Sequence, residues 1–527
     1  MPLLTVLWIS AGNNAGIWQH LSSTVLDTYL WTTALLMLGV GSGTIVIGVS
    51  TAWLVTMCRF PGKSIFEWAL LLPIAMPAYI IAFVYTDILE YAGPVQTQLR
   101  SWFGWASPND YRFPEIRSLG GAITMMTLTL YPYVYLLSRA AFAEQNVGVF
   151  EASRTLGMTI WQSFFRVALP LARPAIVIGV SLVLMESLND FGTVDFFAVK
   201  TFTAGIYDVW LNMNSVAGAA QLAVVLLVFV IALIALERHA RGSKGFQQTT
   251  DTYLPLPSFP LSGWRAASAS LLCLVPIGLG FLLPAAVLTG YASRHYEATI
   301  EANYLSFLSN SLMLSSLAAV IALVLGLFLA SANRYSRSRL QLFASRFAAM
   351  GYAMPGAVLA VGILVMFGRF DNAADEWMRQ LFGVPTGLLL SGTMIALTFG
   401  YVTRFLALSF GAAESSLSKV KPSMEDAARS LGEGPVGILR RVHFPIIRAS
   451  LLAAALLVFV DGMKELPMTV ILRPFNFETL ATFVYQYASD ELLEEAALAA
   501  LTIVAAGVLP VILLSYGLRH TRPGDRN

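Results

Sequence analysis

The sequence predicts an all-α membrane protein that crosses the bilayer many times. Of its 527 residues, 57% are hydrophobic and only 12% are charged, which is about half the charged fraction of a typical soluble domain. Apolar runs of about 20 residues, the length of a membrane-spanning helix, recur along the whole chain. These runs are continuous and do not alternate with a period of two, which favours helices over a β-barrel. A polar segment that occurs twice indicates an internal repeat.

The apolar runs predict about eleven transmembrane helices. Their approximate ranges are 29–55, 65–88, 119–143, 173–197, 216–236, 266–290, 305–330, 344–368, 387–411, 447–473 and 496–516. Basic residues are concentrated after the first and seventh spans, in the segment 237–265 and in the tail 517–527. Because short basic loops stay in the cytoplasm, we expect an external N-terminal segment, 1–28, and a cytoplasmic C-terminal tail.

The repeated polar segment has a fixed residue pattern. An acidic residue is followed by two small residues, by a Gly six positions after the acid, and by a Pro thirteen positions beyond that Gly. The first copy, near 145–170, places these at Glu151, Ala152, Ser153, Gly157 and Pro170, and the second, near 415–445, places them at Asp426, Ala427, Ala428, Gly432 and Pro445. Each copy lies between two apolar spans, which predicts a cytoplasmic loop that occurs twice.

The wide and constant offset between the two copies divides the chain into two halves. We expect a first five-helix half at 29–236 and a second at 291–516. A cytoplasmic linker at 237–265 and one extra transmembrane helix at 266–290 join them. Because a single extra helix lies between the halves, both have the same orientation, and the repeats are parallel and not inverted.

The sequence contains no nucleotide-binding loop of the Walker type. Pro61-Gly62-Lys63-Ser64 matches its end, but Met57 occupies the position that requires the first Gly. The mechanism of that loop needs its glycines, because backbone amides cradle the phosphates. We therefore expect no ATP site in this chain.

The two polar segments resemble the EAA loop of ABC-importer permeases. Ser153 replaces an Ala of that pattern, and Asp426 and Phe444 replace a Glu and a Leu. The resemblance implies a type I ABC-importer permease fold, in which each loop is a coupling helix that docks in a groove of a separate ATPase. Gly157 and Gly432 would end the first helix of each loop.

The same resemblance implies a division of labour between subunits. Small residues would let the loop backbone approach the ATPase closely, and Arg154 and Arg429 could pair with its carboxylates. A homodimeric ATP-binding cassette subunit would bind ATP and Mg²⁺. This chain would hold no cofactor and would not itself be an enzyme.

Acidic residues occur in the span after each loop. They are Glu186 and Asp190 in the first half and Asp461 and Glu465 in the second, at the same offset as the two copies of the loop. The spacing of four predicts that each pair shares one helix face. Carboxylates inside a membrane usually face a pathway or a partner, and their oxygens suit a hard cation.

These acids predict a substrate pathway. Glu186 and Glu465 are the candidate transient metal ligands, and Lys464 would neutralise one acid or pair with an anion that accompanies the metal. Another reading stays open, because the acids could instead cap helix ends or join the halves through hydrogen bonds and ion pairs.

The acid-bearing spans, the fused two-half architecture and the segment 485–491 resemble the fused permeases of ferric-iron importers. This implies movement of ferric iron by alternating access across a bacterial inner membrane, from a periplasmic or lipid-anchored binding protein. Membrane lipids would surround the chain, and no nucleic-acid partner is expected. Thiamine, a polyamine, a phosphonate or sulfate remain alternative cargoes. A proton-coupled secondary transporter is a further alternative, although such a carrier needs no ATPase dock.

Overall fold

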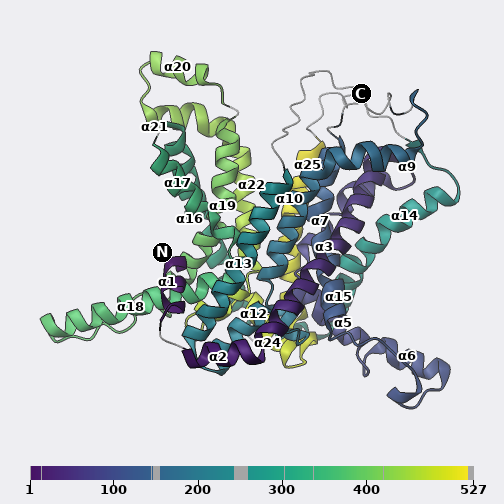
Figure 1. Ribbon diagram of the computed structural model, residues 1–527, viewed down its shortest axis with the longest axis horizontal. Coiled ribbons are helices and arrows are strands. Elements are labelled where there is room, and N and C mark those ends of the chain that lie inside the picture. Colours follow the sequence, from purple (N-terminus) through teal and green to yellow (C-terminus); the bar gives the residue numbers. More distant parts are fainter. Residues whose placement is uncertain are drawn as a thin grey trace. The chain divides into compact units, whose positions relative to one another are not determined.

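The structure, a computed structural model, describes residues 2–12, 15–143, 145, 153, 155–241, 259–301, 303–335, 338–418 and 420–519 (Figure 1). Over these residues the fold is all-α, apart from one parallel pair of two-residue strands, β1 (Cys58–Arg59) and β2 (Phe259–Pro260). The prediction of an all-α polytopic membrane protein is confirmed.

Nine helical segments among the described residues are long and apolar enough to cross a membrane. They are Leu26–Met57, Trp161–Asn189, Val216–Glu237, Trp264–Glu297, Tyr304–Tyr335, Gly356–Phe382, Met394–Ser418, Val436–Met463 and Leu493–Ile512. A bent pair, Lys63–Ala75 with Ala78–Phe103, forms a tenth if it is one broken span. The remaining predicted span, 119–143, is the 25-residue helix α7 (Leu119–Ala143), which carries more polar residues.

The predicted continuous spans 65–88 and 344–368 are wrong, because each contains a break at a Met-Pro pair. In the first half, α4 (Lys63–Ala69) and the 3₁₀ turn η1 (Leu72–Ala75) meet α5 (Ala78–Leu89) and α6 (Pro94–Phe103) at an angle of 89°. Met76 is extended and Pro77 precedes α5. In the second half, α17 (Arg339–Ala348) and η6 (Ala349–Ala353) end at the extended Met354, and Pro355 precedes α18 (Gly356–Phe382). A residue before proline disfavours the helical conformation, which explains both breaks.

The two halves contain the same series of helices. The pairs are α3 (Leu26–Met57) with α16 (Tyr304–Tyr335), α7 with α19 (Met394–Ser418), α10 (Leu169–Asn189) with α22 (Phe444–Met463), and α13 (Val216–Arg241) with α25 (Leu493–Arg519). A glycine brings the first two helices of each half together. A Cβ on Gly48 would lie 2.9 Å from the Tyr135 amide nitrogen, and a Cβ on Gly326 would lie 2.7 Å from that of Phe410. Small residues permit such close helix packing in membranes.

The predicted extra helix at 266–290 is made of three segments in a row. They are α14 (Trp264–Ile277), the π-helical turn η5 (Gly278–Leu282) and α15 (Leu283–Glu301). The Tyr85 hydroxyl donates to the Leu279 carbonyl at 2.8 Å, which ties this helix to α5. Of the predicted linker 237–265, residues 242–258 lie outside the described residues, and its end pairs with β1 through β2.

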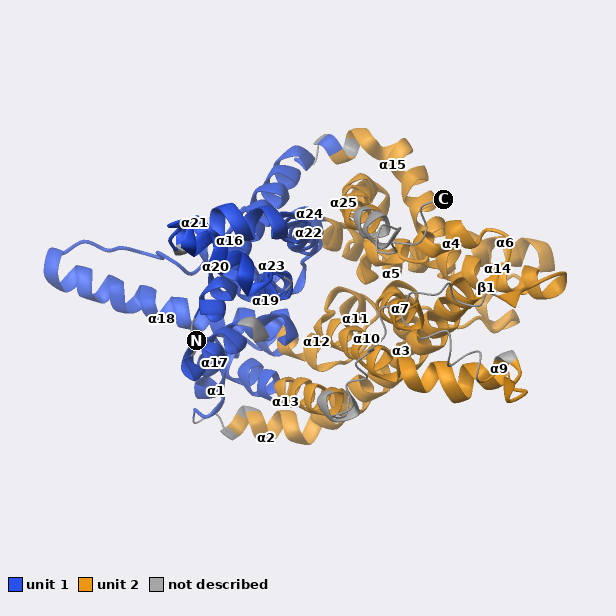
Figure 2. Cartoon of the chain, turned by 90° about the horizontal axis from the view of Figure 1, so that it is seen from above, with its two compact units in different colours: residues 1–14, 209–224, 300–483 blue, residues 15–208, 225–299, 484–527 orange. Residues whose placement is uncertain are grey.

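The chain packs into two compact units, which Figure 2 colours separately. Unit 1 comprises Met1–Asn14, Val209–Val224 and Ile300–Phe483, and unit 2 comprises Ala15–Asp208, Val225–Thr299 and Val484–Asn527. The units do not coincide with the sequence repeats, because each also takes in helices from the other half.

The helices at the chain ends illustrate this exchange. In unit 1, α1 (Pro2–Ser10) packs on α18, and the Arg369 guanidinium lies 3.5 Å from the centre of the Trp8 ring. In unit 2, α25 packs on η1, where a Cβ on Gly507 would lie 2.8 Å from the Ala75 carbonyl oxygen. The second short N-terminal helix, α2 (Ala15–Thr24), belongs to unit 2.

Candidate functional site

The second copy of the repeated motif forms a helix, a tight turn and a second helix. These are α20 (Pro422–Ser430), a turn at Gly432 with φ of +85°, and α21 (Pro435–Ile438), which continues through the π-helical turn η7 (Leu439–His443) into α22. The Glu433 amide donates to the Ala428 carbonyl at 3.0 Å. This bond across a left-handed glycine closes a helix end in the usual way. Figure 1 shows α20 and α21 beyond the ends of α19 and α22.

The motif residues of the second copy are mostly exposed. Asp426, Ala427, Arg429, Gly432 and Pro445 are exposed, whereas Ala428 is buried. Arg429 donates to Asp426 at 2.7 Å within the same helix. Pro445 lies in the first turn of α22, directly after the π-helical turn η7. Proline has no amide hydrogen to donate to the carbonyl one turn earlier. The π-helical turn before it accommodates that carbonyl.

The first copy has the same local geometry where it is described. Glu151, Ala152 and Arg154 lie outside the described residues. Gly157 has φ of +75°, and the Met158 amide donates to the Ser153 carbonyl at 3.0 Å, which is the counterpart of the bond between Glu433 and Ala428. After α9 (Ile160–Ser163) and the π-helical turn η3 (Phe164–Ala168), Pro170 lies in the first turn of α10. The helix–turn–helix prediction agrees with this geometry.

Both loops expose large apolar side chains at matching positions. Beside the turn glycine, Leu156 is 77% exposed and Leu431 is 85% exposed. At the start of the following helix, Trp161 is 67% exposed and Val436 is 78% exposed. The members of each pair occupy equivalent places in the two copies, counted from the turn glycine. Sequence reasoning missed these residues, although their position beside a predicted turn and outside the apolar spans is readable. Apolar side chains gathered on a polar loop indicate a surface for a partner.

A buried ion-pair cluster holds the second loop to the membrane helices. Glu425 of α20 is 5% exposed and His443 of η7 is fully buried. One carboxylate oxygen of Glu425 accepts from Nε of Arg334, on α16, and from Nε2 of His443 at 2.8 Å. Its other oxygen accepts from Arg429 at 3.2 Å. Burial alone would raise the pKa of Glu425, but the hydrogen bonds from Arg334 and His443 hold this pKa below its ordinary value, so the carboxyl is ionised at neutral pH.

Arg334 also closes the end of α19. Its two terminal nitrogens donate to the backbone carbonyls of Leu417 and of Val420, the latter at 2.7 Å. Basic side chains commonly bind the last carbonyls of a helix in this way. Sequence reasoning counted Arg334 only as a topology signal and did not single out Glu425, which directly precedes the motif acid.

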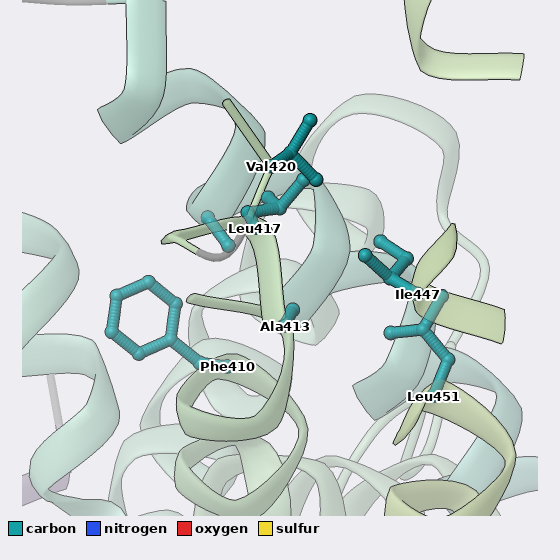
Figure 3. Close-up of a cluster of buried hydrophobic side chains, with 7 residues drawn as sticks. Phe410, Ala413, Leu417, Val420, Ile447 and Leu451 are labelled. Carbon is teal, nitrogen blue, oxygen red and sulfur yellow. The ribbon is translucent and has the colours of Figure 1, made fainter. Parts of the chain in front are cut away.

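An apolar cluster lies beside these charges (Figure 3). Its buried members come from α16, from α19 and the residues after it, and from α22: Ala330, Phe410, Ala413, Leu417, Val420, Ile447 and Leu451. The cluster joins the ends of three membrane helices directly beneath the second loop. Arg334 donates to the carbonyls of two of its members, Leu417 and Val420, so the cluster adjoins the buried charges.

Glu186 and Asp190 lie at the end of α10, where the Asp190 amide still donates to the Glu186 carbonyl at 3.0 Å. Helix α10 ends at Asn189, and Asp190 has extended backbone geometry with ψ of 129°. The Asp190 carboxylate accepts from the Thr193 amide at 2.9 Å and from the Thr193 hydroxyl at 3.0 Å, at the start of the short helix α11 (Gly192–Phe196). An acidic side chain that caps the next helix competes with continuation of the previous one. Glu186 stays on α10 and is partly exposed.

The predicted shared helix face of Asp461 and Glu465 is wrong, because the Glu465 amide bonds to the Gly462 carbonyl and no longer follows the helix. Helix α22 ends at Met463, and Glu465 lies in the break before α23 (Pro467–Leu472). Its carboxylate accepts from the Met468 amide at 3.2 Å, just as Asp190 accepts from Thr193. Proline at the first position of α23 favours a new helix start there. The open alternative that these acids cap helix ends is thus what the structure contains for Asp190 and Glu465.

The second break also contains two ion pairs. Lys464 lies 2.9 Å from Asp461, an acid that it could neutralise. Arg404 of α19 lies 3.4 Å from Glu465, and the side chains are 4% and 5% exposed. Sequence reasoning missed Arg404, although it is the single basic residue within an otherwise apolar predicted span. Among the described residues, no group of three or more His, Cys, Asp or Glu side chains could hold a metal ion.

The short helices beyond the breaks complete each half. They are α12 (Phe202–Tyr207), which continues into the π-helical turn η4 (Asp208–Asn212), and α24 (Leu480–Ser489). In unit 2, the Phe191 and Tyr207 rings stack with their centres 3.7 Å apart. The first break therefore combines the Asp190 cap with aromatic packing, whereas the second contains two ion pairs.

Comparison with known proteins identifies one family twice in the chain. The family described as "Binding-protein-dependent transport system inner membrane component" matches residues 44–242 and 322–520. The two matches correspond to the two predicted halves and confirm the duplication of a permease half.

Individual relatives share this similarity. The Fe(3+)-transport system permease protein FbpB 2 of Haemophilus influenzae is 27% identical over 487 residues, which cover 92% of this chain and 88% of the relative. The ferric transport system permease protein FbpB of Actinobacillus pleuropneumoniae is 22% identical over 452 residues, 80% of this chain and 61% of the relative. The molybdenum transport system permease protein ModB of Escherichia coli K12 is 28% identical over 225 residues, 41% of this chain and 95% of the relative.

Proposed function

Because this chain belongs to the family of binding-protein-dependent transport system inner membrane components, we propose that it is the permease subunit of an ATP-driven importer for ferric iron. The observation that supports ferric iron as the cargo is the end-to-end similarity to a ferric permease, over 92% of this chain and 88% of the relative. The match to a molybdenum permease covers only 41% of this chain, as expected for a relative with a single permease half.

The family places the chain in the inner membrane as a multi-pass protein that works with a binding protein and an ATPase. We propose that the ATPase is a homodimer, since one chain supplies two docking loops of the same local geometry. ATP and Mg²⁺ would bind in that partner, and hydrolysis would occur there. The N-terminus would be external and the C-terminus cytoplasmic, as the basic loops favour.

The acids after each loop are the proposed lining of the iron pathway. Glu186 is partly exposed on α10 and is the strongest candidate for transient contact with the cation. Asp461 forms an ion pair with Lys464. Contact of iron with Glu465 would require its release from Arg404, so Glu465 would act only in another state of the transport cycle. Asp190, which caps α11, would attract the cation electrostatically and would not contact it directly.

Reconstitution tests the cargo. The chain is assembled with its ATPase in proteoliposomes, and a ferric-iron-loaded binding protein is added outside. ATP-driven accumulation of iron is expected, measured against vesicles without ATP. Parallel vesicles receive binding proteins loaded with molybdate or sulfate. ATP-driven uptake of either oxyanion without iron uptake would contradict the iron assignment. Uptake that is independent of ATP and driven by a proton gradient would support a secondary transporter instead.

Glu186→Gln is expected to lower iron uptake about tenfold, the effect of losing roughly 1.4 kcal/mol of stabilisation in the rate-limiting step. The substitution keeps the size of the side chain and removes its charge, so the ATPase should still copurify. The control is Glu115→Gln, because Glu115 is exposed in the loop before α7. Initial uptake rates equal to those of the unmodified protein would remove Glu186 from the iron pathway.

A further inference from the structure

We propose that Glu425, Arg334 and His443 form a clamp that makes the second docking loop move as one rigid body with α16 and α22, and that the matching sequence positions of the first half supply no charged counterparts to it. The proposal rests on the proposed function, since it concerns how an ATPase under the loops drives the membrane helices. The three residues are positioning residues, and none of them contacts the cargo.

The clamp joins four elements through one carboxylate and one guanidinium. Glu425 belongs to α20, Arg334 to α16 and His443 to the turn that enters α22. Arg334 adds the end of α19 through the carbonyls of Leu417 and Val420. The loop helix is therefore tied to α16, to the end of α19 and to the turn that enters α22.

The burial of these groups makes separation costly. Glu425 and His443 are both at most 5% exposed, and the Tyr335 ring stacks on His443 with centres 6.3 Å apart. Since the ionised Glu425 accepts from Nε2 of His443, that nitrogen carries the proton. Removing one partner of a buried charge pair leaves an uncompensated charge, which is strongly unfavourable. A displacement of α20 is thus passed to α16 and α22 and is not absorbed in the loop.

The first half has no charged residue at the corresponding positions of the sequence. Thr56 stands where α16 has Arg334, counted along two helices of equal length. Counted from the turn glycine of each loop, Phe150 stands where the second copy has Glu425, and Ala168 stands where it has His443. Of these three residues, Phe150 lies outside the described residues.

Two neutral hydrogen bonds join described residues of the first loop region. Ser153 bonds to Ser163 at 2.9 Å, and Gln145 donates to the Ala168 carbonyl at 2.8 Å. The second of these bonds ends on the backbone of the residue that corresponds to His443. At this position the first loop uses a backbone carbonyl as a hydrogen-bond acceptor, whereas the second loop uses the side chain of His443 in a charged network.

Aromatic packing accompanies these neutral contacts in the first half. The Trp53 ring lies 4.9 Å from the Phe164 ring and 5.5 Å from the Phe142 ring, centre to centre. Ring contacts allow sliding with small changes in energy, whereas a buried ion pair has one favourable arrangement. The two docks therefore transmit motion unequally, and the second dock carries the larger share.

A neutral version of the clamp tests this in the full complex. The double variant Glu425→Gln with Arg334→Gln removes both charges and keeps a side-chain donor for the carbonyls at the end of α19, so thermal stability and ATPase copurification should stay close to those of the unmodified complex. Iron taken up per ATP hydrolysed is expected to fall about tenfold, within the range by which residues between coupled sites alter coupling. Ser163→Ala, which removes the bond to Ser153 in the first dock, is the matched variant and should change this ratio less than twofold.

A second measurement needs no cargo. Spin labels at Ser430→Cys on α20 and Leu452→Cys on α22 are placed in a background of Cys58→Ala and Cys273→Ala. In the unmodified clamp their distance should be narrow and equal in the ATP-free and ATP-trapped complexes, and in the double variant it should broaden. Absent iron uptake in the unmodified protein would count against the cargo alone. An unchanged uptake ratio in a stable double variant, or a label distance that shifts with ATP in the unmodified clamp, would overturn the proposal.

Discussion

Replacing both Leu156 and Leu431 with aspartate is expected to prevent the ATPase from copurifying with this permease. Each leucine is more than three-quarters exposed beside the turn glycine of its loop, at positions that correspond across the repeat. Burial of a leucine side chain at an interface contributes about 2 kcal/mol. Loss of both contacts should therefore weaken ATPase binding by roughly a thousandfold. Copurification and ATP-driven uptake measure the effect.

Leu156→Met with Leu431→Met is the matched control, because methionine keeps the apolar contact and nearly the same volume. Each single aspartate variant should retain partial binding, since the other loop still docks. If the ATPase remained bound to the double aspartate variant at near-normal affinity, the two leucines would lie outside the docking surface and the assignment of the loops would need revision.

Arg404→Ala is expected to lower the free energy of unfolding by about 3–5 kcal/mol, because it leaves the Glu465 carboxylate buried without its counter-ion. Both side chains are at most 5% exposed and lie 3.4 Å apart, so water cannot replace the lost partner. The change is read as a lower thermal unfolding temperature of the purified protein in lipid nanodiscs.

Glu465→Gln added to Arg404→Ala should restore much of that stability, since it removes the uncompensated charge and keeps an acceptor for the Met468 amide. Arg379→Ala is the exposed counterpart, as the Arg379 side chain is 59% exposed and pairs with Asp375 on α18, and it should cost less than about 1 kcal/mol. A stability of Arg404→Ala equal to that of the starting protein would show that the pair is not needed for folding.

Some features of the site were predictable because their causes are local. The turn glycines Gly157 and Gly432 have positive φ as expected, since only glycine adopts that conformation without strain. The prolines Pro170 and Pro445 begin the next helix. The break after Met463 is readable in part from Pro467, whereas a spacing of four predicts a continuous helix in both spans. Whether a helix continues also depends on whether a side chain accepts hydrogen bonds from the amides that follow it. The spacing of residues does not reveal such bonds.

The amino-acid sequence by itself determined that this chain crosses a membrane many times, that it is built from two parallel halves, and where the two repeated loops lie. These properties follow from apolar length, repetition and turn chemistry, which act between residues close in the chain. Only the tertiary structure decided that Glu465 faces Arg404, that Glu425 faces Arg334, and that the chain-end helices α1 and α25 pack in units with the opposite half. Such pairings join residues far apart in sequence, and the low dielectric of a packed interior decides which charges must meet.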